Sequence, residues 1–289
     1  MTKELILKKN NTQITLMDKD DIQSTYATKE EVNNITSGSN GMDITLINSK
    51  DEISSNGIYF YVEPKLTLTV EGNSITFFSN AYVEQFHDIA DDYWLEADNN
   101  IIIDWGDGST DTLPNQVTDS LTHTYTDELT SHDITFEYNH LYIGPLAFSG
   151  CSIEKAYIPT GVHIGQYSFF DSNIKNVTIN VNIPDDSFKN CSQLESVKIN
   201  NADYIGEAFT DCENLTFVSI PDTVTFMINS FYNCDNITDY QLYWTNEKII
   251  NWDADTMPTN EDTIFTIPQG ETQNYIDHDY PEELLVERS

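Results

Sequence analysis

A short segment recurs five times between residues 143 and 242, and this repeat limits the possible folds more than any other feature of the chain. Each copy contains a phenylalanine, and successive copies place it 21, 19, 21 and 22 residues apart: Phe148, Phe169, Phe188, Phe209 and Phe231. A cysteine follows three residues later in four copies, Cys151, Cys191, Cys212 and Cys234, and Ser172 occupies that place in the second copy. An aliphatic residue such as Leu194 or Leu215 then precedes a short alternating strand.

A period near 21 residues with one short strand per copy predicts a solenoid of stacked coils. A single coil cannot bury its own apolar edge, so neighbouring coils must stack, with their strands about 5 Å apart. Stacking aligns the phenylalanine, cysteine and leucine positions into continuous ladders inside the solenoid. We therefore expect these residues to form the core of the protein, and not a reactive centre.

The cysteines admit two other interpretations. A metal site favours two cysteines close in sequence, as in C-x-x-C, whereas the nearest pair here is 21 residues apart. Disulfides between neighbouring coils are the second alternative, and the lack of an amino-terminal secretion signal argues against them. We expect buried free thiols that pack as small hydrophobic groups, with no metal and no cofactor.

The segment "IGEAFTDCENLTFVSIPDTV" at 205–224 resembles the BspA-type leucine-rich repeat family, and the resemblance extends over residues 143–242. Such repeats are common in surface proteins of gut and oral bacteria, in some protists, and in phages of such bacteria. The segment "FTIPQGETQNYID" at 265–277 resembles the extra strand and short helix that close these arrays. A cap of this kind is required because the last coil would otherwise expose its core.

Upstream of the repeats, "IIIDWGDGSTDT" at 101–112 and "LTHTYTDELTSHDITFEY" at 121–138 predict several strands and a tight turn. The combination of W-G-D-G with a later H-x-Y resembles a PKD-type β-sandwich. The matching positions are Trp105, Asp107, His123 and Tyr125, and the sandwich turn also includes Asp104, Gly106 and Gly108. Before them, "LTLTVEGNSITFFS" at 66–79 predicts a β-hairpin that turns at residues 71–74.

The polar residues of the W-G-D-G turn have two interpretations each. Asp104, Asp107 and Asp111 offer hard oxygen ligands for calcium, but a full ligand loop with a closing glutamate is missing, which favours a simple turn. His123 with Asp107 suggests acid–base chemistry. The sandwich resemblance instead implies a hydrogen-bonded strand histidine, and we favour that interpretation.

The first forty residues differ in character from the rest. "KELILKKNNTQITLMD" at 3–18 predicts a hairpin, Thr28 with Glu31 forms a capping box for a short helix, and "TSGSNG" at 36–41 reads as a linker. We therefore predict a mainly β chain in four parts. They are an attachment and oligomerisation segment with linker at 1–41, a β-sandwich at 42–142, a leucine-rich-repeat solenoid of five coils at 143–250, and a cap at 251–289.

The chain carries 48 acidic and 13 basic residues, a formal net charge of −35. This charge repels phosphate backbones and anionic lipid heads, so we expect neither nucleic acid nor a membrane surface as a partner. It also has a simpler interpretation, which is solubility. No segment approaches 18 uninterrupted apolar residues, and no secretion signal is recognisable, so we expect synthesis in a cytoplasm without membrane insertion or general secretion.

These features favour a non-enzymatic virion appendage protein of a tailed phage, of the tail-fibre or head-fibre type. Residues 1–41 would dock to other virion proteins, and the rest would face a host-surface glycan or protein receptor as a homo-oligomer, expected to be a trimer. One alternative is an adhesin of the BspA type at a bacterial cell surface. A third hypothesis is a polysaccharide depolymerase, which requires paired carboxylates across a groove.

Binding would use exposed positions of the solenoid strands, for which we expect Lys175, Lys198, Thr216, Ser219 and Tyr240. Aromatic side chains can stack on sugar rings. The aromatic candidates are Tyr157, Tyr204, Tyr232, Tyr243 and Trp244. The alternative is that these aromatic residues pack between the coils.

Overall fold

A computed structural model describes residues 65–78, 94–245 and 262–288 in full, together with the backbone of four strands among the first 64 residues. The chain divides into two compact units, Met1–Pro64 and Lys65–Ser289. In the first unit, β1 (Leu5–Lys9) and β2 (Thr12–Leu16) pair antiparallel, which confirms the predicted hairpin. Strands β3 (Ile44–Ile47) and β4 (Ile58–Tyr61) pair parallel. The predicted capping-box helix and the linker at 36–41 lie outside the described residues.

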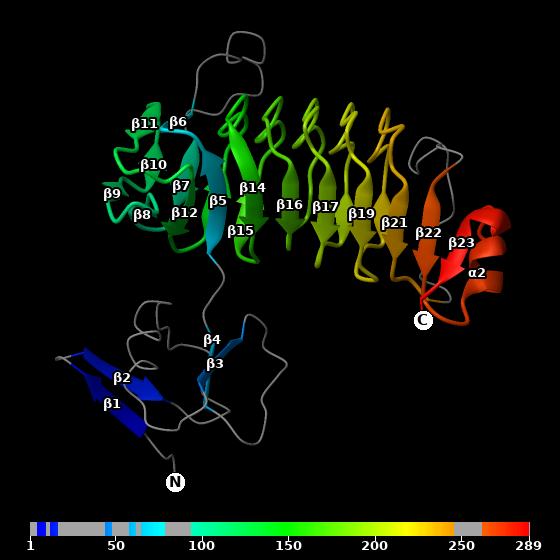
Figure 1. Cartoon of the computed structure of the whole chain (residues 1–289), viewed down its shortest axis with the longest axis horizontal. Coiled ribbons are helices and arrows are strands. Elements are labelled where there is room, and N and C mark those ends of the chain that lie inside the picture. Colours follow the sequence, from blue (N-terminus) through cyan, green and yellow to red (C-terminus); the bar gives the residue numbers. More distant parts are fainter. Residues whose placement is uncertain are drawn as a thin grey trace. The chain divides into compact units, whose positions relative to one another are not determined.

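The second unit is built on one sheet of eleven strands, which we call the long sheet (Figure 1). Its spatial order is β23-β22-β21-β19-β17-β16-β14-β5-β12-β8-β9. The strands are β5 (Leu66–Glu71), β8 (Ile101–Asp104), β9 (Thr110–Leu113), β12 (Ser131–Glu137), β14 (Ile153–Ile158), β16 (Asn176–Ile179), β17 (Ser196–Ile199), β19 (Phe217–Ile220), β21 (Asp239–Leu242), β22 (Ile264–Ile267) and β23 (Leu285–Glu287).

From β14 onward the long sheet is parallel, with one strand from each coil. In β17, Val197 and Ile199 point into the core while Ser196 and Lys198 point outward, the period-two pattern of a half-buried strand. The register aligns equivalent residues of neighbouring coils, since Val197 lies beside Val177 on one side and Val218 on the other. The chain is therefore mainly β, and the predicted solenoid of stacked coils is confirmed.

The opposite side of the solenoid carries shorter strands. Each coil runs from a long-sheet strand to this second side, then through a turn that bears the repeat phenylalanine. The short strands are β13 (Leu141–Ile143), β15 (Val162–Ile164), β18 (Tyr204–Ile205) and β20 (Phe226–Met227). Strand β13 pairs parallel with β15, β18 pairs parallel with β20, and an isolated bridge joins Ile183 to Ile205.

The region before the repeats is joined to the solenoid by hydrogen bonds between strands. Strand β5 pairs antiparallel with β12 on one side and with the first repeat strand, β14, on the other. The border predicted at residue 142 therefore falls within one continuous sheet. The other strands of this region are β6 (Ser74–Phe77), β7 (Leu95–Ala97), β10 (Gln116–Val117) and β11 (Leu121–Thr124), which pair as β6 with β11 and as β10-β7-β13.

The hairpin predicted at 66–79 is wrong in its pairing. Both strands form, but β5 belongs to the long sheet while β6 pairs with β11 in a separate two-stranded sheet. The connection at Gly72, with a φ of +99°, leads the chain from one sheet to the other instead of folding it back on itself.

The carboxyl-terminal cap confirms the expected strand and short helix. Strand β22 is followed by α2 (Thr272–Ile276), a 3-10 helix η3 (Glu282–Leu284) and β23. Tyr275 from α2 is buried, and its hydroxyl donates a hydrogen bond to the carbonyl oxygen of Trp244, 3.1 Å away. The cap thus covers the end of the solenoid core with an aromatic side chain.

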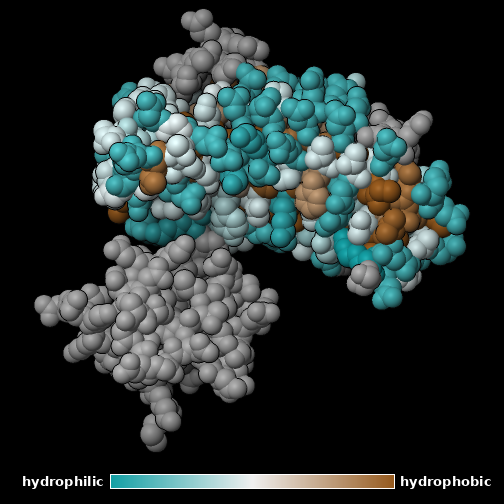
Figure 2. Space-filling model, viewed as in Figure 1, coloured by the Kyte–Doolittle hydropathy of each residue, from teal (hydrophilic) through white to brown (hydrophobic). Residues whose placement is uncertain are grey.

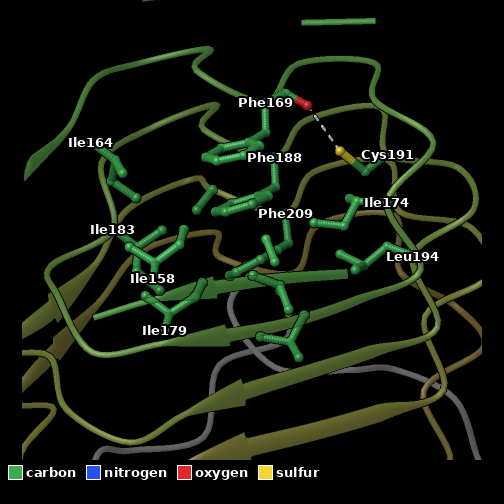
Figure 3. Close-up of a cluster of buried hydrophobic side chains, with 14 of the residues drawn as sticks. Ile158, Ile164, Phe169, Ile174, Ile179, Ile183, Phe188, Cys191, Leu194 and Phe209 are labelled. Carbon is green, nitrogen blue, oxygen red and sulfur yellow. Dashed lines mark hydrogen bonds between the residues drawn. The ribbon is translucent and has the colours of Figure 1, made fainter. Parts of the chain in front are cut away.

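The core contains a ladder of stacked phenylalanine rings (Figure 3). Centroid distances from Phe148 through Phe169, Phe188, Phe209 and Phe231 are 5.2, 4.8, 5.2 and 5.2 Å. The last three contacts are nearly parallel, with interplanar angles of 8°, 12° and 3°. These spacings match the separation of adjacent strands, so each coil contributes one ring per rung.

Candidate functional site

The repeat cysteines form a second ladder beside the phenylalanines. All four are free and buried. The Sγ atoms of Cys191, Cys212 and Cys234 donate hydrogen bonds to the carbonyl oxygens of the phenylalanines one coil earlier, at 3.2, 3.3 and 3.0 Å. Figure 3 shows the first of these bonds, from Cys191 to Phe169. The thiols therefore pack and tie neighbouring coils together.

Burial favours the protonated form of three of these thiols. It raises the pKa of Cys151 and of Cys191 to about 12, and it raises the pKa of Cys212 well above its ordinary value of 9.0. A neutral thiol can donate to a carbonyl oxygen and is a poor nucleophile. Ser172 takes the same place in its coil, and its Oγ lies 3.4 Å from the Sγ of Cys191. All five positions of this ladder are buried in the core.

Sequence reasoning missed the residue before each cysteine. That residue has a positive φ in every copy: Gly150, Asp171, Asn190, Asp211 and Asn233, with φ between 54° and 64°. Glycine, asparagine and aspartate are the residues that enter this left-handed region most readily. This column of the repeat contains only these three residue types, which was the available signal, and it marks a turn of fixed geometry in each coil.

The W-G-D-G turn gathers its predicted residues, apart from Gly108, into one hydrogen-bonded cluster. Asp104 accepts a bond from the backbone N–H of Gly106, and Asp111 accepts one from the Trp105 indole at 2.9 Å. Asp107 accepts from the N–H and the hydroxyl of Ser109 and from His123 Nε2 at 2.9 Å. Gly106 must be glycine, since its φ is +82° and a Cβ would lie 2.7 Å from the carbonyl oxygen of Asp133.

Aromatic rings continue this cluster across the end of the solenoid. The His123 ring stacks on Trp105 with centroids 4.4 Å apart, and Tyr125 meets His123 edge-on at 4.8 Å. The Tyr125 hydroxyl donates to the carbonyl oxygen of Trp105 at 3.2 Å. The Tyr125 ring also stacks on the buried His132, which bonds Asp127 at 3.0 Å.

The electrostatics of the cluster centre on Asp107. The hydrogen bond from the Ser109 hydroxyl, followed by the Ser109 backbone N–H and His123, holds the pKa of Asp107 well below its ordinary range. The carboxylate stays ionised to low pH and fixes the turn to the strand that carries His123. Each carboxylate of the W-G-D-G turn accepts a hydrogen bond from a neighbour, which fits a structural clamp, whereas Nδ1 of the buried His132 has no hydrogen-bond partner among the described residues. Among residues 65–78, 94–245 and 262–288, no group of three potential metal ligands comes together.

The outward side of the long sheet, which we call the outer face, is a candidate binding surface. It carries polar side chains in aligned rows, for example Tyr157, Thr178 and Lys198 on β14, β16 and β17. In Figure 2 this side is mostly hydrophilic, with hydrophobic colour over β22 and β23. Exposed Ile264 and Val286 lie on those two strands, and the Arg288 guanidinium sits 3.5 Å above the Tyr243 ring.

The predicted surface residues do not form one site. Tyr157 and Tyr243 lie on the outer face, half-buried and exposed respectively, whereas Tyr204 lies on the opposite side in β18. Tyr232 is exposed in the phenylalanine turn. Trp244 was predicted as a surface candidate and is wrong, because its side chain is buried and its Nε1 donates to the carbonyl oxygen of Val224 at 2.8 Å.

Two of the expected strand positions are also corrected. Tyr240 points inward and is fully buried between Phe231 and Phe265. Ser219 points outward but is buried, because its small side chain lies between the larger Lys198 and Gln241 of the adjacent strands. Lys198 and Thr216 are exposed as expected, and Lys175 is partly exposed.

A family model of known proteins matches the repeat region of this chain. Residues 122–238 match the family described as BspA type Leucine rich repeat region, in six copies. The match begins before the five coils counted in the sequence. A search of curated proteins found no match to this chain. In the described part of the chain, no helix has the length and apolar character needed to cross a membrane.

Proposed function

We propose that this chain is a non-enzymatic attachment protein, an adhesin displayed at a bacterial cell surface, with the solenoid as the part that contacts its ligand. The observation that carries the proposal is the long sheet. Eleven hydrogen-bonded strands present one continuous outer face of polar and aromatic side chains. Its repeats match the BspA-type leucine-rich repeat family. The resemblance to this family implies a surface protein of bacteria.

The ladders give this face the rigidity that attachment needs. Stacked phenylalanines and thiol–carbonyl bonds fix each coil to the next, so outward side chains keep a spacing of about 5 Å along the solenoid. A surface that is already ordered loses little conformational freedom when a ligand binds. Repeated weak contacts along such a face add through multivalency, especially when many copies are displayed.

An adhesin is favoured over a virion appendage by the matched repeats. The matched repeats at 122–238 fit a bacterial surface protein directly. The virion hypothesis depended on docking by residues 1–41, whose side chains lie outside the described residues. The depolymerase hypothesis needs two carboxylates on either side of a bound sugar. The acidic groups of the W-G-D-G turn are instead held by their own neighbours.

Attachment can be tested with the purified full chain, labelled with a fluorophore, on epithelial cells, mucus and extracellular matrix. We expect saturable binding to at least one of these surfaces, and labelling of the producing bacterium's exterior by antibody on intact cells. Binding to none of them, with antibody signal only after the cells are opened, would contradict the proposal. Detection of the protein in purified phage particles would restore the virion hypothesis.

A further inference from the structure

Most of the described basic residues of the second unit lie on one side of it. The described segments hold six lysine and arginine residues: Lys65, Lys155, Lys175, Lys189, Lys198 and Arg288. All except Lys189 lie on or at the edge of the outer face. Lys155 and Lys198 are outward positions of β14 and β17, and Lys175 reaches over β14 to Glu71. In a chain of net charge −35, the three lysines at β14, β16 and β17 offset the nearby Glu71, Glu154 and Glu195, so this part of the outer face is not strongly acidic.

We propose that the outer face over β14, β16 and β17 binds a linear polysaccharide that carries carboxylate groups. The inference rests on the attachment role proposed above and names its ligand class. Three consecutive strands each contribute a lysine, on or directly before the strand, so the positive charges are spread over about 10 Å across the sheet. This spacing suits an extended polymer with charge on successive sugars better than a single small anion.

The lysines are available to a ligand. Lys155 lies 3.9 Å from Glu154, and Lys175 lies 3.8 Å from Glu71, with both lysine side chains substantially exposed. Exposed pairs of this length contribute little stability, so a ligand carboxylate can replace the protein partner. Lys198 is exposed and makes no ion pair with the other described residues.

Neighbouring side chains suit a carbohydrate. Tyr157 lies in the same row as Thr178 and Lys198, which places an aromatic ring and a hydroxyl beside a positive charge. Asn176 and Ser196 occupy the next row, where the Ser196 hydroxyl donates to the Asn176 side chain at 2.7 Å. Rings can stack on sugars, and amide and hydroxyl groups can bond sugar hydroxyls.

The surrounding charge argues against other anionic polymers. Duplex DNA carries one charge per about 1.7 Å, and its binding depends on neutralising many phosphates with a basic surface. Glu154 and Glu195 lie at the starts of β14 and β17, and Asp239 lies on β21, so the positive area is confined. A polymer with one carboxylate per sugar or per two sugars is sparse enough to fit it.

The test uses the full chain and polygalacturonate, with methyl-esterified polygalacturonate as the uncharged version of the same polymer. Poly-L-glutamate and oligo-dT serve as anions of other classes. We expect saturable binding to polygalacturonate, weakened by salt, and at least about tenfold weaker binding to the other three polymers. Equal binding of the esterified polymer, of poly-L-glutamate or of oligo-dT would overturn the assignment.

Variants locate the site. K198Q should weaken polygalacturonate binding about threefold, and K155Q/K175Q/K198Q at least about tenfold. K189Q is the matched control, since it removes one lysine charge from the phenylalanine-turn side, and it should leave binding unchanged. Y157A should weaken binding without changing its salt dependence, and circular dichroism checks that each variant is folded. Equal effects of K198Q and K189Q would overturn the placement on the outer face.

The two proposals fail in different ways. Binding of the full chain to cells or mucus without binding to polygalacturonate would contradict the proposed carboxylate-glycan ligand, and it would still support the attachment role. Absence of binding to any cell or matrix surface would contradict attachment itself, whatever the result with the purified polymer.

Discussion

The Sγ atom of Cys234 lies 3.0 Å from the carbonyl oxygen of Phe209, one coil earlier in the solenoid. The same relationship links Cys212 to Phe188 and Cys191 to Phe169. The first cysteine, Cys151, instead bonds the carbonyl oxygen of Thr76 in β6 at 3.3 Å. The repeated bond therefore extends from the solenoid into the strands that precede it, and it gives the recurring thiol a packing role in each coil.

Two substitutions of Cys212 should distinguish the stability that its hydrogen bond contributes from the stability that its side-chain volume contributes. Cys212→Ala removes both, and we expect it to lower the free energy of unfolding by about 1–2 kcal/mol. Cys212→Ser keeps a donor of similar size, as Ser172 does in its own coil, so its cost should be smaller. Urea denaturation followed by circular dichroism measures both, with the exposed Ser192→Ala as a control. A serine variant less stable than the alanine variant would contradict the role assigned to the bond.

The buried thiols should make the protein sensitive to alkali. The folded pKa of Cys191 is raised to about 12 from an ordinary value of 9.0. A raised folded pKa means that this contribution to stability is complete below about pH 9 and is lost as the pH rises towards 12. We expect the urea midpoint to fall over this interval, and to fall less steeply in Cys191→Ser, which has no thiol to titrate at that position. Equal slopes for the two proteins would show that other groups control the alkaline transition.

The ladder could be predicted from the sequence because each of its residues recurs at a fixed interval. Phe188, Cys191 and Leu194 each occur in register with equivalents in other coils, and burial follows from stacking. The pairing of β5 could not be predicted in this way. Alternation identifies Leu66–Glu71 as a strand, but its partners, β12 and β14, lie sixty or more residues away and are chosen by the core, not by local sequence.

The error at Trp244 has a different cause. Tyr240, Leu242 and Trp244 alternate inward along the end of β21, and Tyr243 points outward. Period-two alternation was present in "YQLYW", but the segment departs from the other strands of the repeat and its aromatic residues were assigned to the surface. Large rings are needed here because the phenylalanine ladder ends at Phe231, and Tyr240, Phe265 and Tyr280 fill the space beyond it.

A cavity in the phenylalanine ladder should weaken several coils together. Phe209 is fully buried and stacks at 5.2 Å on both Phe188 and Phe231, so Phe209→Ala should cost about 3–5 kcal/mol. Phe209→Leu fills more of the space and should cost less. Hydrogen exchange should rise in the coils on both sides of residue 209, because each coil is held by its neighbours. Faster exchange confined to a single coil would contradict this coupling.

The clamp at Asp107 should govern stability in acid. Its folded pKa lies below the ordinary value of 3.8, chiefly because the Ser109 hydroxyl and N–H stabilise the carboxylate. A lowered folded pKa gives a contribution that is present above about pH 4 and is lost as the pH falls further. Asp107→Asn removes the charge, so the variant should be less stable at pH 7 and should lose less stability between pH 5 and pH 2 than the unmodified protein. Thermal unfolding across that pH range measures the difference. Asp119→Asn, a change at an exposed acidic residue, is the control and should follow the unmodified protein. If Asp107→Asn instead keeps the same acid dependence, the carboxylate does not hold the turn in the way that its three hydrogen bonds indicate.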